Sequence, residues 1–204
     1  ADESQTYGEL PDWFFVPKVF TSSNLPLVYI DTYGQEIPDE PRIIAHMGII
    51  NNASGLNKLS DPFNDYDGRI NIEIRGSSSQ MFPKKSYSLE TQDEFGENLN
   101  VPILDMPEEN DWILYAPYSD KSLMRNVLSY QWWTDLGHYG PRTRYCELFL
   151  NNEYKGIYVF TERIKRDKNR VDIAKLTVDD VSGDDVTGGY IVKIDKPDGE
   201  EGWT

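Results

Sequence analysis

A short loop rich in serine and in cations is the stretch of this sequence whose residue types are best suited to chemistry. It reads Arg-Gly-Ser-Ser-Ser-Gln-Met-Phe-Pro-Lys-Lys from Arg75 to Lys85. Small residues leave backbone N–H groups and hydroxyls free to point at a ligand, and cations at both ends attract anions. In a chain with a formal net charge of −15, this concentration of cations predicts a cradle for phosphate oxygens. The structural alternative is an ordinary hairpin connection whose lysines keep an edge strand soluble.

Two strand-like runs, residues 69–75 and 84–90, must position this loop. Both alternate apolar and polar side chains with the period of a half-buried strand. The alternation places Lys84 and Lys85 on opposite faces, and Lys85 shares its face with Tyr87 and Leu89, the expected buried side. Because a lysine directed inward needs an anion, we expect Lys85 rather than Lys84 to bind a phosphate or a carboxylate.

Three further polar residues complete the predicted site. Glu162, on a later strand, is the carboxylate expected to pair with the inward lysine, the alternative being a solvated charge at a strand end. Arg125 and Asn126 lie in the second turn of a predicted helix, 119–136, and the alternative for Arg125 is a solvated side chain. Asp120 is expected to cap that helix rather than to bind a metal.

The remaining patterns predict the framework around these residues. In the helix, Leu123, Val127 and Tyr130 recur at helical spacing, which predicts an apolar face packed on a sheet, and Gly137 predicts its end. Further strands are expected at 27–31, 42–50, 145–150, 153–161 and 189–195, with a tight turn at Asn151-Asn152. The expected fold class is α+β: one helix packed on an antiparallel sheet built from 69–75, 84–90, 145–150, 153–161 and 188–195.

Composition excludes several classes of protein. The net charge of −15 disfavours binding to the nucleic-acid backbone. With one cysteine, Cys146, no disulfide forms within the chain, and two distant histidines do not make a His-rich zinc site. We expect no membrane span, because no apolar run approaches about 20 residues. The first residues are typical of a processed N-terminus, which together with the family resemblance given next predicts an exported protein.

Seven segments, in order along residues 65 to 195, resemble the spore-coat-protein-H (CotH) family of atypical secretory protein kinases. They are I-E-I-R-G-S-S-S at 72–79, F-P-K-K-S-Y-S-L-E at 82–90, L-D-M-P-E-E-N-D-W-I-L at 104–114, Y-S-D-K-S-L-M-R-N at 118–126, E-L-F-L-N-N-E-Y-K-G-I-Y at 147–158, T-E-R-I at 161–164 and G-G-Y-I-V-K-I-D at 188–195.

The resemblance implies a kinase-like small lobe that binds ATP with a divalent metal such as Mg. It divides the chain into a lead-in, 1–64, and the first part of a kinase-like domain, 65–204. The implied nucleotide-binding residues are Arg75, Gly76, Ser77, Ser78, Ser79, Lys84, Lys85, Glu162, Arg125 and Asn126. By analogy with kinases, the backbone of 190–195 is expected to contact the edge of adenine. The family's acidic catalytic and metal-binding residues are expected downstream of Thr204, so the chain taken alone is expected to be inactive.

Two functions follow from these patterns. The first is ATP-dependent phosphorylation of secreted, coat or surface proteins, with this chain as the nucleotide-binding half. The second is a non-catalytic, adhesin-like surface module on a kinase-like scaffold. Both place the protein outside the cell, on its surface or in a spore coat. The identity of the protein substrate and the oligomeric state remain open at this point.

Overall fold

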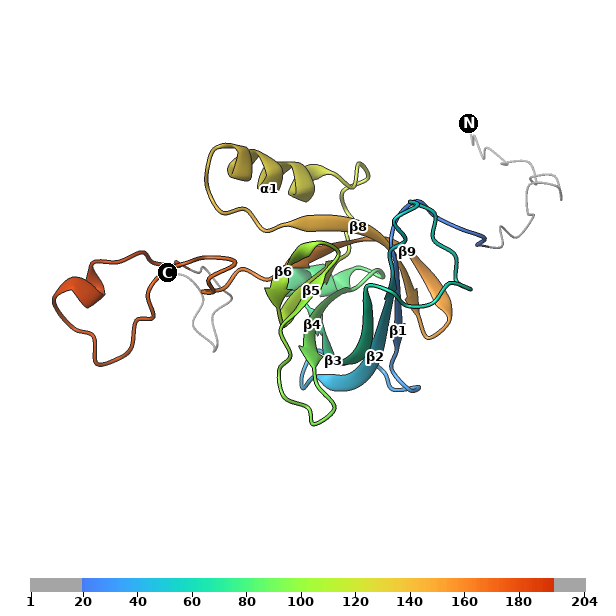
Figure 1. The fold of residues 1–204 in the computed structure, drawn as a ribbon, viewed down its shortest axis with the longest axis horizontal. Coiled ribbons are helices and arrows are strands. Elements are labelled where there is room, and N and C mark those ends of the chain that lie inside the picture. Colours follow the sequence, from blue (N-terminus) through green and yellow to red (C-terminus); the bar gives the residue numbers. More distant parts are fainter. Residues whose placement is uncertain (1–19, 193–204) are drawn as a thin grey trace, which may run out of the picture.

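A closed barrel of seven strands forms the centre of the computed structural model, which describes residues 20–192 (Figure 1). Around the barrel the strands follow the order β1-β2-β3-β4-β7-β9-β8. Each strand pairs antiparallel with its neighbour except β1 and β8, which pair in parallel and close the barrel. The strands are β1 (Leu27–Asp31), β2 (Ile43–Ile50), β3 (Tyr66–Arg75), β4 (Ser86–Gln92), β7 (Asp111–Tyr115), β8 (Thr143–Leu150) and β9 (Glu153–Glu162).

The other elements lie outside the barrel wall. Strands β5 (Val101–Ile103) and β6 (Met106–Glu109) form a separate two-stranded ribbon, and helix α1 (Arg125–Asp135) connects β7 to β8. Short 3-10 turns occur at Ser78–Met81 and Asp184–Val186. Within residues 20–192, no helix has the length and apolar character that crossing a membrane requires.

Apolar side chains fill the barrel interior, so it is a packed core rather than a pore. Alternate residues of each strand point inward, and the largest of these side chains are fully buried. Trp112 and Phe160 pack with their ring centroids 5.5 Å apart, and Tyr87 lies 6.3 Å from Tyr158. Because each strand directs one set of alternate side chains into the core, the pairing register of the wall is strongly specified.

The predicted α+β fold, one helix packed on an antiparallel sheet, is wrong: the described chain is mostly β and its sheet closes into a barrel. The predicted strand 27–31 is confirmed as β1, and those near 42–50, 69–75, 84–90, 145–150 and 153–161 match β2, β3, β4, β8 and β9. The predicted last strand, 188–195, has no strand over 188–192, and the rest of it lies outside the described residues. β1 and β2, from the predicted lead-in, belong to the same barrel as the later strands, and the division at residue 64 stays a prediction.

The predicted helix is shorter than 119–136 and does not pack on the sheet. α1 starts only at Arg125, since the chain before it turns through Leu123 at φ +61°. None of the helix residues is buried, and its side chains at Leu128 and Trp132 are 40% and 63% exposed. The amphipathic pattern therefore predicted a helix correctly but overestimated its burial, because Val127 and Tyr130 of the predicted face are only half-buried.

Two predicted turns are confirmed by backbone geometry. Asn151 and Asn152 adopt φ +50° and +65° in the hairpin between β8 and β9. These left-handed angles are tolerated by asparagine better than by most residues. Gly137 ends the region of α1 at φ +86°, an angle that glycine adopts without steric cost.

Candidate functional site

The outer face of the barrel wall forms the floor of a cleft of about 720 Å³. Strand register explains how its side chains come together. Residues paired across neighbouring strands point to the same side of a sheet, so one continuous row crosses five strands. That row consists of Glu73, Ser88, Ile113, Thr161 and Thr143. Ile113, Thr161 and Thr143 line the cleft, whereas Glu73 and Ser88 line a smaller hollow of about 280 Å³ beside it. Arg75, Gly76, Ile113 and Arg163 line both.

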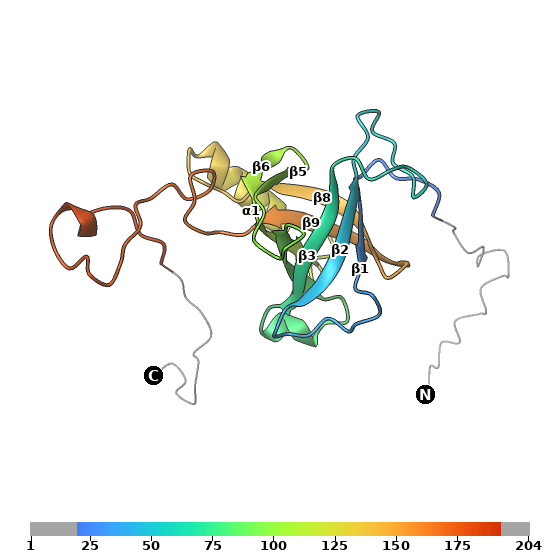
Figure 2. The same ribbon diagram turned by 60° about the horizontal axis from the view of Figure 1, so that its bottom comes forward.

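The serine loop, residues 76–82, lies at the end of β3 (Figure 2). Its residues Gly76, Ser79 and Phe82 line one side of the cleft. Gly76 adopts φ +115°, and a Cβ atom there would lie 2.1 Å from the Ser79 hydroxyl oxygen. A side chain at position 76 would therefore be strained and would displace the Ser79 hydroxyl. The Gln80 side-chain amide donates to the Gly76 carbonyl oxygen over 2.6 Å and holds the loop closed. Ser79 lines the cleft and Ser77 the small hollow, whereas Ser78 lines neither.

Lys84, not Lys85, reaches the cleft. The Lys84 ammonium donates to the Ile157 carbonyl oxygen over 2.6 Å and lies 4.4 Å from the centroid of the Tyr158 ring. Burial lowers the pKa of Lys84. Among the described residues it forms no ion pair with a carboxylate. Lys85 instead donates to the Gln80 carbonyl oxygen and lines neither hollow. The predicted inward face of Lys85 assumed that the strand began at residue 84, but β4 begins at Ser86.

Arg75 is the second cation of the cleft. It ends β3, where its backbone pairs with Ser86 of β4. Although part of its surface is exposed, burial of the remainder lowers the pKa of Arg75, and the positive charge of Arg163 lowers it further. Arg75 has no ion pair within residues 20–192. The nearby Glu73 carboxylate is held by Arg42 over 3.1 Å.

Glu162 lines the cleft, but its carboxylate is not available to a lysine. The side chain is fully buried and lies 2.7 Å from the Arg142 guanidinium. It also accepts from the Arg142 backbone N–H over 2.9 Å and from the Tyr139 hydroxyl over 3.1 Å. Burial, together with this carboxylate, raises the pKa of Tyr139. Arg142 is thus the partner of Glu162, and the predicted pairing with Lys85 is not formed.

The helix contributes Asn126 to the cleft and leaves Arg125 outside it. The Arg125 side chain is 81% exposed, with its guanidinium 3.7 Å from Asp120. The Asp120 carboxylate accepts from the Ser122 hydroxyl over 2.6 Å and from the Arg125 backbone N–H over 2.9 Å. The Ser122 hydroxyl, followed by the Arg125 N–H, lowers the pKa of Asp120. Asp120 thus accepts from the first N–H of α1, but it lies outside the helix, whose N-cap residue is Met124.

Sequence reasoning missed Arg163 and the apolar floor. Arg163 opens a basic run, 163–170, whose density was a usable signal. Ile113 and Tyr115 come from β7, whose nearly continuous burial gives no alternation of apolar and polar residues. Ile191 and Val192 line the cleft, within the range expected to meet adenine, and residues 193–195 of that range lie outside the described chain.

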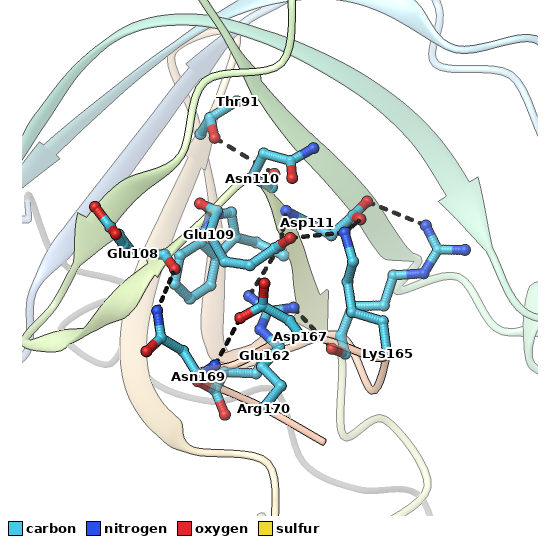
Figure 3. A network of polar contacts seen from close by, with 12 residues as sticks. Thr91, Glu108, Glu109, Asn110, Asp111, Glu162, Lys165, Asp167, Asn169 and Arg170 are labelled. Atoms are coloured by element: carbon cyan, nitrogen blue, oxygen red, sulfur yellow. Dashed lines mark hydrogen bonds and ion pairs between the residues drawn. The ribbon is translucent and has the colours of Figure 1, made fainter. Parts of the chain in front are cut away.

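The basic run mostly pairs with acidic residues at one end of the barrel wall (Figure 3). We call the cluster of Glu109, Asp111, Lys165 and Arg170 the paired network. Lys165 lies 2.6 Å from both Glu109 and Asp111, and Arg170 lies 3.3 Å from Glu109. Arg163 joins the edge of this network, with its guanidinium 3.1 Å from Asp111. These cations, foremost Lys165, lower the pKa of Asp111 despite its burial.

Comparison with known proteins identifies the family of this chain. The chain is 30% identical over 95 residues to the inner spore coat protein H of Bacillus subtilis (strain 168). That match covers 47% of this chain, and this chain spans about a quarter of the relative's length, since the match covers 24% of it. A family model described as CotH kinase protein matches residues 72–202, from the end of β3 through the cleft-lining segments. The protein therefore belongs to the CotH kinase protein family.

Proposed function

We propose that the cleft binds the polyphosphate of ATP and that this chain supplies the nucleotide-binding part of a protein kinase. The observation that carries the proposal is the state of the two cleft cations. Arg75 and Lys84 have no carboxylate partner within residues 20–192, although the sequence holds 35 acidic residues against 20 basic ones. Cations kept free of carboxylates, beside a loop of small residues, are suited to binding an anion.

The residues present fit a phosphate group in three respects. Gly76 has no Cβ, which lets the Ser79 hydroxyl lie close against the loop backbone on the side of the cleft. Arg75 offers a planar fork of donors, and Lys84 offers a point charge whose present partners are only a carbonyl oxygen and an aromatic ring. The cleft volume of about 720 Å³ lies within the range of ligand pockets.

Each group has a distinct expected role. Lys84 and Arg75 would hold and neutralise phosphate oxygens, and Ser79 would donate a hydroxyl hydrogen bond. Ile113 and Val159 would form an apolar surface for the base. ATP, when bound, would supply the phosphoryl group for transfer. Mg accompanies the nucleotide in this proposal, and no cluster of metal ligands occurs among residues 20–192.

The family also supports a proposed setting. Because the curated relative is named as an inner spore coat protein, we place this protein at a spore coat or at the cell surface, with coat or surface proteins as substrates. A second function, a non-catalytic binding module, is favoured by one observation. Met124, Leu128, Trp132 and Leu136, spaced four residues apart along the region of α1, are all exposed.

Calorimetry of the purified chain with MgATP tests the proposal. Wild-type protein should bind, and Lys84→Ala should weaken binding about tenfold or more, the contribution of a charge-assisted contact. Lys85→Ala is the matched control and should bind like wild type, because Lys85 lies outside the cleft. If wild type does not bind MgATP, or if Lys85→Ala is the variant that loses affinity, the assignment of the cleft is wrong and the binding-module function is preferred.

A further inference from the structure

Arg163 belongs to two regions of the molecule. Its guanidinium pairs with Asp111 at the edge of the paired network, and the residue also lines both the cleft and the small hollow. It follows the last residue of β9, and Arg75 ends β3. Ile113 of β7 lies on the floor between them and lines the same two hollows. The two guanidinium groups thus approach the same space from opposite sides of one apolar side chain.

The two guanidiniums repel each other: burial lowers the pKa of Arg75, and the positive charge of Arg163 lowers it further. Such a like-charge pair is stabilised when a multivalent anion lies between its members. Two planar donor forks facing one hollow also match the several oxygens of a phosphate group better than one point charge does. Asp39, Glu40 and Glu73 also line the small hollow, and the Glu73 carboxylate is already engaged by Arg42.

Arg163 can leave its present partner without stranding a buried charge. Its side chain is 47% exposed, whereas that of Asp111 is 10% exposed. If Arg163 moves away, the Asp111 carboxylate still has the Lys165 ammonium at 2.6 Å. Its buried charge therefore keeps a partner. The Arg163–Asp111 pair is therefore exchangeable, in contrast to the Glu162–Arg142 pair, whose carboxylate is fully buried.

We infer that Arg163 is a phosphate-binding residue: it exchanges Asp111 for a phosphate group of the ligand, which it clamps together with Arg75. The inference rests on the proposed function for the identity of the ligand, and it goes further by naming a second guanidinium and an internal competitor. Asp111 competes with the ligand for Arg163. The Arg163–Asp111 ion pair, which must break when the ligand binds, therefore lowers the affinity of the site for phosphate. The clamp recognises phosphate itself and is independent of the base.

Because Asp111 and the ligand compete for Arg163, the two substitutions in this ion pair should change ligand affinity in opposite directions. Asp111→Asn removes the competing charge and should strengthen binding of the ligand a few-fold, whereas Arg163→Ala should weaken it about tenfold or more. Arg163→Lys keeps the charge but loses the planar fork, so it should bind with intermediate affinity. Lys168→Ala is the control, because Lys168 belongs to the same basic run but pairs with the exposed Glu108.

The experiment is calorimetry of each variant with three probes: MgATP, sodium tripolyphosphate and adenosine. Wild type should bind the first two, and only these should respond to Arg163→Ala and Asp111→Asn. If tripolyphosphate binds and responds while MgATP does not bind, the clamp stands and the nucleotide function fails. If MgATP binds but Arg163→Ala leaves it unchanged, or if Asp111→Asn weakens it, the clamp is overturned and the nucleotide function stands. If neither polyphosphate binds, both are overturned.

Discussion

Two regions of this molecule use the same residue types in opposite ways. In the paired network, Lys165 and Arg170 each face a carboxylate, and Glu109 is almost completely buried between them. In the cleft, Lys84 and Arg75 face a carbonyl oxygen, an aromatic ring and another guanidinium. The difference shows that a cation's function depends on its partners rather than on its identity. Paired cations fix a loop to the barrel, and cations without carboxylate partners are available to a ligand.

The largest expected effect on stability concerns the buried ion pair of the paired network. Glu109→Gln should lower the free energy of unfolding by about 3–5 kcal/mol, because it leaves the fully buried Arg170 guanidinium without a countercharge. Urea denaturation followed by tryptophan fluorescence measures the loss. Glu108→Gln is the adjacent control, since its pair with Lys168 is exposed, and it should change stability by less than about 0.5 kcal/mol. Equal losses in both variants would erase the distinction between buried and exposed pairs.

A second prediction concerns the wall of the cleft. Gly76→Ala should lower the free energy of unfolding by about 1–3 kcal/mol and weaken MgATP binding, because the new Cβ would lie 2.1 Å from the Ser79 oxygen at a φ of +115°. Adding Ser79→Ala to this variant should restore part of the loss by removing that oxygen. Gly34→Ala, at φ +79° with no atom within 4 Å, should lose only about 1 kcal/mol. Failure of Ser79→Ala to rescue the double variant would show that the clash is not the cause.

The two lysines should give pH dependences of opposite sign. Burial lowers the pKa of Lys84, whereas Asp111 and Glu109 raise that of Lys165 above its usual 10.5 despite burial. Between its lowered pKa and 10.5, Lys84 binds more protons in the unfolded state, so its contribution to stability rises with pH. Lys165 contributes stability that is fully present below 10.5 and lost as pH rises through its raised pKa.

Urea denaturation of wild type, Lys84→Met and Lys165→Met between about pH 8 and 11 measures both contributions. The difference between wild type and each variant cancels the titration of the buried tyrosines, which affects all three proteins alike. Parallel difference curves for the two lysines would contradict the assignment of one as paired and the other as lacking a carboxylate.

The smallest expected effect extends the contrast to apolar residues. Trp132→Ala in α1 should change the free energy of unfolding by less than about 0.5 kcal/mol, because 63% of that side chain is already exposed. Trp112→Ala, which empties a fully buried site in the barrel, should lose about 3–5 kcal/mol. A loss for Trp132→Ala as large as that for Trp112→Ala would mean that the helix is packed after all.

Local patterns predicted most strands but not their closure. Alternation of apolar and polar residues marks β3 and β4, since the core-facing side chains of each are apolar and the intervening ones polar. β7, Asp-Trp-Ile-Leu-Tyr, is buried along almost its whole length, so it shows no alternation and was missed. Closure depends on pairing between β1 and β8, which no periodicity in either strand encodes. The amphipathic pattern of α1 predicts burial by a neighbour but cannot identify one.

The candidate site was predictable in composition and not in geometry. The serine loop and its cations stand out because glycine, serines and lysines are dense there. Which lysine reaches the cleft depends on where β4 begins, a boundary that the alternation of 84–90 placed two residues too early. The partner of Glu162 is Arg142, twenty positions earlier in the chain, and only the pairing of β8 with β9 brings them together.

The parallel seam between β1 and β8 has a consequence for how the chain folds. The hydrogen bond from the Thr32 backbone N–H to the Asn151 side chain joins residues 119 positions apart. During synthesis, β1 and β2 emerge long before β8, so β1 has one edge without a strand to pair with. Contacts of such sequence separation form slowly, because the entropy of closing the intervening loop is lost before the pairing stabilises it. Until the seam closes, both edges can pair with strands of other chains, and the nascent protein is most prone to aggregate then.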